Sequence, residues 1–264
     1  MSKDSSLLKM APQNDKLTLC TFNCRSVKSS LEEVVNLCDS CDLIFLQEHW
    51  LLPYELDYLS RIHSDYIAIG QSSVDISSSA LVGRPYGGTG ILYKQSLSGY
   101  IWVVNTDDPR ITAVILNSKC GPILLVCVYM PTHYGDGDSF ENYISTSAKI
   151  TALFAECDAV ELIVAGDFNC QHGSRFFDIF SNFVLDNDLM LTDFNRLHDV
   201  FTYCNDAGTS MSWIDHIVCS KTIDCMVSNC SVLYDFVSSD HKQLTVTFAG
   251  LCLDTPITAQ NNNK

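Results

Sequence analysis

The chain has 264 residues, 47% of them hydrophobic, which is enough for one large domain or two small ones with a sizeable buried core. Its longest apolar run is far shorter than the roughly 20 residues that a membrane-spanning helix needs, which excludes such a helix. The formal net charge of −15, from 16 basic and 31 acidic residues, excludes a protein that binds nucleic acid by charge alone.

The acidic balance leaves two explanations open. Acidic side chains can cluster to hold a divalent cation, which would neutralise part of their charge, or the substrate is not a polyanion. The 13 cysteines are odd in number and scattered, and Cys38 and Cys41 form a lone close pair without the partners of a zinc site. We interpret them as reduced core thiols of an intracellular protein.

The first half of the chain reads as short apolar strands with one early helix. A helix over residues 30–40 is predicted from the spacing of Leu31, Val34 and Leu37. A Ser-rich and Gly-rich loop covers residues 72–88, and a turn signal stands at residues 119–122. The predicted strands are residues 17–22, 43–47, 90–94, 101–104, 112–117 and 123–129.

The second half alternates helices with strands. An amphipathic helix is predicted over residues 141–157, with Tyr143, Ile144 and Ile150 among the residues on its apolar side. Further elements are a strand at 162–165, a helix at 176–186, and strands at 214–219 and 244–248. This order predicts one domain of two packed sheets flanked by helices over residues 17–250, after a disordered lead-in (1–16) and before a disordered tail or linker (251–264).

Polar residues stand at the ends of several predicted strands. Taken singly, each has an ordinary explanation as a turn former, a helix cap or a solvated residue. As an ordered set they indicate a crevice, because ligands of α/β sheets bind where strand ends converge. The set comprises Asn23, Glu48, Tyr129, Asp167, Asn169, Asp215, Asp240 and His241.

The motifs TFNCRS, FLQEHW, VYMPT, AGDFN, SWIDHIV and SSDH carry these residues. In this order they resemble the endonuclease/exonuclease/phosphatase family over nearly the whole chain. Within the family, the segment FTYCNDAGTSMSWIDHIVCSK is most similar to the endonuclease of LINE-type non-LTR retrotransposons. It departs from inositol phosphatases, in which an Arg tends to follow the Asp that corresponds to Asp215.

The resemblance implies a four-layered α/β sandwich with two mixed sheets between helices. It also implies Mg²⁺ as cofactor, with Mn²⁺ as an alternative. Glu48 would be the main carboxylate ligand of the ion, with Asn23 and Asp240 close to it. Hard divalent ions prefer such oxygen ligands.

Roles in phosphodiester hydrolysis follow from the same resemblance. His241 would act as general base or phosphate stabiliser and would be oriented by Asp215, while Asp167 would position or deprotonate the water. Asn169 and Tyr129 would donate hydrogen bonds to the scissile phosphate. Substrate contacts are expected from Arg25, Thr202, Ser212 and Ser239. Arg25 departs from relatives that repair abasic DNA, which usually carry an acidic residue there. His216 is expected to point away from the site.

The implied substrate is double-stranded DNA, nicked on one strand to leave a 3′-hydroxyl that primes reverse transcription. A reverse transcriptase, fused or separate, is the implied partner, a membrane is not, and the location would be nuclear or cytoplasmic. The loop at 205–211 would probe the minor groove. Few cations are available near the substrate, which predicts weak, salt-sensitive binding. These cations are Arg25, Lys28, Arg84, Arg175 and Lys221.

Three alternatives stay open. One is a phosphatase or sphingomyelinase-like phosphodiesterase acting on a small or lipid phosphate, which the acidic balance favours. Another is an abasic-site repair enzyme. The last is a catalytically inactive relative that serves as a binding or scaffold module, although a dead copy would be free to lose Asn23, Glu48, Asp167 and His241.

Overall fold

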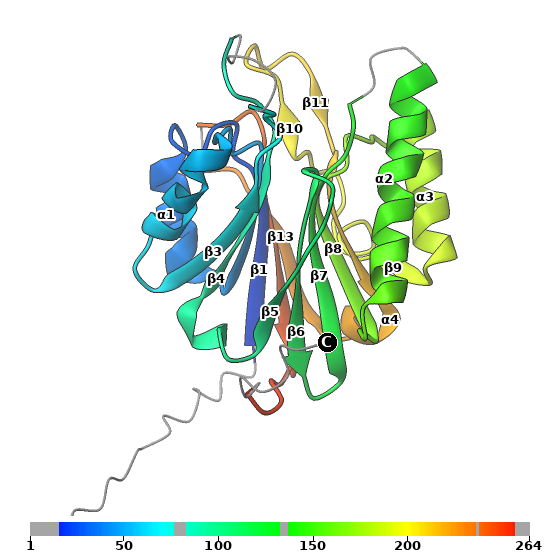
Figure 1. Ribbon diagram of the computed structural model, residues 1–264. Coiled ribbons are helices and arrows are strands. Elements are labelled where there is room, and N and C mark those ends of the chain that lie inside the picture. The colour runs from blue at the N-terminus through cyan, green and yellow to red at the C-terminus, as the bar shows by residue number, and fades with distance from the viewer. Residues whose placement is uncertain (1–15, 77–82, 133–136, 236–237, 257–264) are drawn as a thin grey trace, which may run out of the picture.

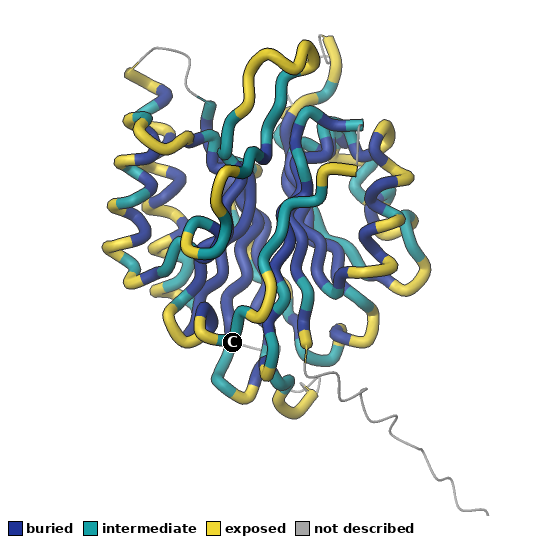
Figure 2. Tube along the Cα trace, turned by 180° about the vertical axis from the view of Figure 1, so that it is seen from behind, coloured by how far each residue is buried: buried dark blue, intermediate teal, exposed yellow. Residues whose placement is uncertain are grey.

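A computed structural model of the chain describes residues 16–76, 83–132, 137–235 and 238–256. Two six-stranded sheets stack face to face, and helices cover the outer face of each sheet (Figure 1). The strands in the middle of the molecule are the most deeply buried segments, while the helices expose one side (Figure 2). The predicted four-layered α/β sandwich is therefore confirmed.

The first sheet contains both the first and the last strand of the domain. Its order is β13-β14-β1-β2-β4-β3, with β1 and β2 parallel and the other pairs antiparallel. Parallel pairing brings the carboxyl ends of β1 and β2 to one edge, where the antiparallel β14 begins. The strands are β1 (Lys16–Asn23), β2 (Leu43–Gln47), β3 (Tyr66–Gln71), β4 (Thr89–Lys94), β13 (Val227–Leu233) and β14 (Gln243–Ala249).

The second sheet has the order β5-β6-β7-β8-β12-β9, with β7 and β8 parallel and the other pairs antiparallel. A short hairpin of β10 (Tyr203–Cys204) and β11 (Met211–Ser212) stands outside both sheets. The strands of the sheet are β5 (Ile101–Val104), β6 (Ile111–Ser118), β7 (Gly121–Tyr129), β8 (Glu161–Asp167), β9 (Leu189–Leu191) and β12 (Asp215–Ser220).

The strands alternate their side chains between an inner core and two outer cores. Leu125 and Ile163 of the second sheet meet Phe45 of the first between the sheets. The helices α2 (Gly137–Glu156) and α3 (Arg175–Asp186) cover the second sheet, and α1 (Leu31–Ser40) and η1 (Pro53–Arg61) cover the first. Two short elements remain, η2 (Gln95–Leu97) and α4 (Lys221–Asp224).

The helices follow their apolar spacing and their caps. Ser174 caps α3 by accepting a hydrogen bond from the backbone N of Phe177. The expected apolar side of α2 is partly wrong, because Ile144 is 53% exposed whereas its neighbour Tyr143 is buried. Adjacent helical residues differ by about 100° around the axis, so the two cannot share one face. Buried small polar residues such as Thr146 and Ser147 complete the face instead.

Strands β3, β9 and β13 are absent from the sequence prediction, because all three lie at sheet edges and are only partly buried. Lys16 pairs with Ala249 in the sheet, and the described chain continues beyond residue 250, where Leu253 bridges to Ser118. The rest of the expected lead-in (1–15) and the end of the expected tail (257–264) lie outside the described residues. Among the described helices, none has the length and apolarity to cross a bilayer.

Candidate active site

Strand pairing brings the predicted polar residues to one end of the double sheet. Tyr129 pairs with Asp167 between β7 and β8, and Asp167 pairs with Asp215 between β8 and β12. In the first sheet, Asn23 ends β1 beside the last residue of β2, and Glu48 follows directly. Residues far apart in sequence thus meet because their strands end at the same edge.

His241 lies between two carboxylates. Its Nδ1 is 2.9 Å from Asp215 Oδ2 and its Nε2 is 3.7 Å from Asp167 Oδ2, and all three side chains are at most 7% exposed. Burial acts to lower the pKa of His241, but the negative charges of Asp215 and Asp167 outweigh it and raise the pKa to about 10. At neutral pH the ring is therefore an imidazolium with a hydrogen on each nitrogen, and Nδ1–H donates to Asp215.

Asn23 links the two sheets through its amide nitrogen. Nδ2 donates to Glu48 Oε1 and to Asp167 Oδ2, each at 3.0 Å, and lies 3.4 Å from His241 Nε2. Its Oδ1 accepts the backbone N–H of Arg25 at 3.2 Å. The residue is fully buried, so these contacts replace its hydration and fix the spacing of the carboxylates.

The protonation of Asp167 depends on the charge of His241. Burial raises the pKa of Asp167 most strongly, His241 partly offsets the increase, and Asp215 adds to it, giving about 7. The backbone N–H of Asn169 donates to Asp167 Oδ1 at 2.9 Å. A carboxyl group poised near neutrality can accept a proton from water.

Tyr129 and Asn169 line the same cleft. Burial, together with the charges of Glu48 and Asp167, raises the pKa of Tyr129, so its phenol stays a donor. Asn169 adopts a positive φ of 50° and its Nδ2 donates to the backbone oxygen of Met130 at 2.8 Å, which leaves a second N–H on that nitrogen.

Thr202 and Ser239 are buried beneath the cleft and bond to other site residues. Thr202 Oγ1 accepts the backbone N–H groups of Ile214 and Asp215 at 3.1 and 3.0 Å. Ser239 Oγ donates to the backbone oxygen of Asn23 at 2.7 Å and accepts the backbone N–H of His241. Both hydroxyls hold catalytic candidates in place, and their expected phosphate contacts stay predictions.

Ser212 and Arg25 stand at the hairpin side of the cleft. Ser212 Oγ donates to Gln171 Oε1 at 3.2 Å. Arg25 pairs with Asp206 at 2.8 Å and with Asp240 at 3.2 Å, so its guanidinium joins the hairpin loop to the site. Where the repair relatives would carry an acid, this chain therefore has a cation that pairs with two acids.

The cleft has a volume of about 350 Å³, and sequence reasoning missed part of its wall. Trp50, Thr132, Tyr203 and Ile214 line it without having been predicted. Trp50 stands two residues after Glu48, which is the one sequence signal that could have found it. Of the five expected cations, only Arg25 and Arg84 line the cleft. Lys28, Arg175 and Lys221 instead contact Glu55, Phe140 and Asp188.

A divalent metal ion fits the oxygen-rich wall of the cleft. Glu48 and Asp240 both line it and carry carboxylates, the donors that Mg²⁺ prefers. Ligand atoms of Asp167, Asp215 and His241 also lie within 4.8 Å of one another. That group suits a metal less well, because His241 would first have to lose its proton. Asn23 turns its nitrogen toward Glu48, so its expected ligand role stays a prediction.

His216 belongs to a separate buried pair. Its Nδ1 lies 2.8 Å from Asp193 Oδ2, and its ring stacks on Phe180 on the α3 side of the sheet. Burial opposes its protonation, but Asp193 outweighs burial and raises the pKa of His216. Adjacent strand residues face opposite sides of a sheet, so His216 points away from the site that Asp215 faces.

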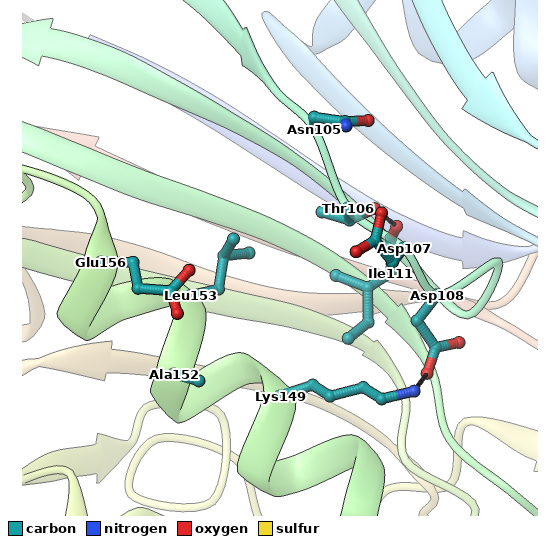
Figure 3. A pocket seen from close by; sticks show the side chains of 9 residues that line it. All are labelled: Asn105, Thr106, Asp107, Asp108, Ile111, Lys149, Ala152, Leu153 and Glu156. Atoms are coloured by element: carbon teal, nitrogen blue, oxygen red, sulfur yellow. Dashed lines mark hydrogen bonds and ion pairs between the residues drawn. The ribbon is translucent and has the colours of Figure 1, made fainter.

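A second hollow, of about 230 Å³, lies between the β5–β6 connection and α2. Lys149 of α2 reaches across it to Asp108 at 2.7 Å (Figure 3). None of the strand-end residues of the cleft lines this hollow, which carries the acidic Asp107 and Glu156 instead. The polar strand-end residues therefore gather at the cleft and not at this hollow.

Residues 20–241 match a protein family described as the endonuclease/exonuclease/phosphatase family. No curated protein matches the chain.

Solved structures share the fold at low identity. A variant of the 3′ phosphatase NExo from Neisseria, bound to product DNA hairpin, is 18% identical with a TM-score of 0.66, covering 88% of this chain and 99% of its own. The AP endonuclease LMAP from Leishmania major is 15% identical (TM-score 0.70; 89% and 88%). The endonuclease domain of TRAS1, a telomere-specific non-LTR retrotransposon, is 14% identical (TM-score 0.64; 89% and 98%).

Proposed function

The chain belongs to the endonuclease/exonuclease/phosphatase family, and from this membership we propose that it is a divalent-metal-dependent DNA endonuclease. It nicks one strand of double-stranded DNA and leaves a 3′-hydroxyl, as a LINE-type retrotransposon requires for priming by a reverse transcriptase. The observation that carries the proposal is the buried His241 held between Asp167 and Asp215 at the base of a cleft that Glu48 and Asp240 line.

In this proposal each side chain has a role that its environment supports. Ionised Asp167 takes a proton from the attacking water, whose oxygen bonds to phosphorus as the P–O3′ bond breaks, and the departing O3′ takes up a proton from solvent to become the 3′-hydroxyl. His241, held protonated by Asp215, stabilises the negative charge that develops on the phosphate. Of the two roles expected for His241, the cationic one fits its raised pKa. Asn169 and Tyr129 donate hydrogen bonds to the same phosphate.

Glu48 and Asp240 would hold the metal ion, with Asn23 fixing the Glu48 carboxylate. When bound, Mg²⁺ or Mn²⁺ supplies positive charge to the phosphate and the leaving oxygen. The other contributions to catalysis come from buried hydrogen-bond donors and acceptors that are already oriented before the substrate binds. Such preorganisation contributes strongly to phosphoryl transfer.

The hairpin of β10 and β11 supports the retrotransposon branch of the proposal. Its loop carries the exposed Asp206 and Gly208, and the hairpin rises at one end of the sandwich (Figure 1). Its residues Tyr203 and Ser212 line the cleft. Asn205 holds the loop shape by accepting the backbone N–H groups of Thr209 and Ser210 with Oδ1, at 2.8 and 3.0 Å. A narrow polar hairpin beside the site suits contact with a DNA groove.

Nicking of supercoiled plasmid tests the proposal. With Mg²⁺ the wild-type chain should convert plasmid to the nicked form, and polymerase extension from the cut should reveal a 3′-hydroxyl. Asp167→Asn should lower the rate by roughly 10²–10⁴-fold. Asp39→Asn, on the exposed side of α1, is the matched control and should act as wild type. A wild-type chain that binds DNA but never cuts it would refute the proposal and favour the scaffold alternative.

A second candidate is a phosphodiesterase or phosphatase that acts on a small or lipid phosphate. It is favoured by the net charge of −15 and by a cleft whose lining includes only two Arg or Lys side chains among the described residues. Incubation with phosphoinositides and sphingomyelin in parallel with plasmid separates the two candidates. An abasic oligonucleotide in the same series tests the repair alternative.

A further inference from the structure

Trp50 contacts the carboxylate that would bind the metal. Its Nε1–H donates to Glu48 Oε2 at 2.9 Å, while Asn23 occupies Glu48 Oε1 at 3.0 Å. The Tyr129 phenol also hydrogen-bonds to this carboxylate. Because both oxygens accept hydrogen bonds, the carboxylate cannot rotate without losing one. An ionised carboxylate offers about four acceptor sites, so an acceptor site remains for a cation.

The backbone holds Trp50 in a conformation that such a bulky residue rarely adopts. Glu48 and Trp50 have φ values of 53° and 55°, in the left-handed region. The N–H of Trp50 donates to the backbone oxygen of Gly87 at 3.1 Å, and His49 between them is anchored to Gln71. Backbone strain of this kind persists only where surrounding contacts impose it, and it gathers at functional sites.

Arg84 lies over the ring of Trp50. Its guanidinium carbon is 4.4 Å from the ring centroid, and both residues line the catalytic cleft. The other cleft arginine, Arg25, already pairs with Asp206 and Asp240. Within the described part of the chain, no carboxylate lies within ion-pair distance of Arg84. Its charge is therefore available to an anion in the cleft.

We propose that Trp50 is a positioning residue that orients Glu48 toward a divalent metal ion and holds Arg84 as a contact for a substrate phosphate. The phosphate half rests on the proposed function, because it takes a DNA backbone as the anion. The metal half rests on Glu48 alone. The indole joins the two groups rigidly, since its N–H serves the carboxylate while its face carries the guanidinium.

Two substitutions separate the halves. Trp50→Phe removes the N–H but keeps a ring for Arg84, and Arg84→Ala removes the cation but keeps the indole. Arg175→Ala is the matched control, because Arg175 is also stacked on an aromatic ring, that of Phe140, but outside the cleft.

Metal binding is measured by calorimetry with Mn²⁺ on the full chain without DNA. Trp50→Phe should bind Mn²⁺ roughly 10-fold more weakly or worse, as is usual when a partner of a metal ligand is lost. Arg84→Ala and Arg175→Ala should bind as wild type. Unchanged Mn²⁺ affinity in Trp50→Phe would overturn the metal half, and plasmid nicking by the wild type would then leave the proposed function standing.

DNA binding is measured in chelator over a range of salt concentrations. Arg84→Ala should reduce the slope of log affinity against log salt by about 0.9, the value for one lost phosphate contact. Trp50→Phe and Arg175→Ala should keep the wild-type slope. An unchanged slope in Arg84→Ala, or an equal drop in Arg175→Ala, would overturn the phosphate half.

A third measurement covers the case in which Trp50→Phe fails to fold. The chain has three tryptophans, so its indole N–H signals can be followed by nuclear magnetic resonance in the wild type. Adding Mg²⁺ should move the Trp50 signal and leave that of Trp102, on β5, in place. A Trp50 signal that does not move would refute the proposal that its N–H orients a metal-binding Glu48, whatever the nicking assay shows.

Discussion

Replacing Asp215 by Asn tests most directly whether the Asp215 charge keeps His241 protonated. Asp215 is fully buried, and its Oδ2 accepts the Nδ1–H of His241 at 2.9 Å. Asn has nearly the same size and can still accept a hydrogen bond, so the substitution removes the negative charge and little else. It should therefore change the protonation of His241 before it changes the fold.

The magnitude follows from the environment of His241. An opposite charge within about 4–6 Å typically shifts a pKa by roughly 1–3 units. The wild-type pKa of His241 is about 10. In Asp215→Asn it should fall by about that range, which would bring deprotonation toward neutral pH. Asp167, at 3.7 Å, still favours the charged ring, so the pKa should stay above the value that burial alone would give.

The sign for stability follows from linkage. The folded-state pKa of His241 lies above its unfolded value of about 6.5, so its contribution is complete below that pH and is lost as pH rises through about 10. Each unit of lost shift corresponds to about 1.4 kcal/mol, so the variant should be less stable by roughly 1–4 kcal/mol below about pH 6.5. The deficit should shrink as pH rises toward 10.

Two measurements check this prediction. Nuclear magnetic resonance titration of the imidazole gives the pKa of His241, and denaturant unfolding from pH 6 to pH 10 gives the stability difference. Asp39→Asn serves as the control for an exposed acid. A His241 pKa that is the same in Asp215→Asn and wild type, or a stability deficit that does not change with pH, would refute the assignment of an imidazolium held by two carboxylates.

Chelator should abolish plasmid nicking and Mg²⁺ should restore it, whereas cleavage that persists in chelator would contradict the metal requirement. Asp193→Ala should destabilise the fold by about 3–5 kcal/mol in denaturant titration, because it removes the carboxylate that pairs with the buried His216 and accepts the backbone N–H of Ile217; a loss below about 1 kcal/mol would count against that charged pair. Gly166→Ala should destabilise by about 1–3 kcal/mol or more, since its Cβ would lie 1.9 Å from the backbone oxygen of Val128; a melting temperature equal to wild type would contradict this close packing of β7 on β8.

The strongest apolar runs could be located from sequence. The strand predicted at residues 123–129 lies within β7, and that at 43–47 coincides with β2, because both are nearly continuous apolar segments. The edge strand β13 has no such run: Asn229 is exposed and Cys230 only half-buried. A strand with one solvent-exposed face and few apolar residues has no alternating apolar pattern that would distinguish its sequence from that of a loop.

The candidate site could be assembled in part from the same sequence. Asn23, Asp167 and His241 were chosen because they stand at strand ends, and the structure brings them together across separations of up to 218 positions. Trp50 was not chosen, since its contact with Glu48 depends on two left-handed backbone positions that no local pattern reveals.

The sequence by itself determined which residue types stand at the strand ends and which segments form the cores, because side-chain periodicity and turn chemistry are local. Only the tertiary structure decided which of those ends converge, that Thr202 and Ser239 face inward to hold Asp215 and His241, and that Arg25 is neutralised while Arg84 is not. Those outcomes depend on strand order and register. A hydrogen bond or an ion pair forms only when two distant backbones place its atoms within about 3–4 Å.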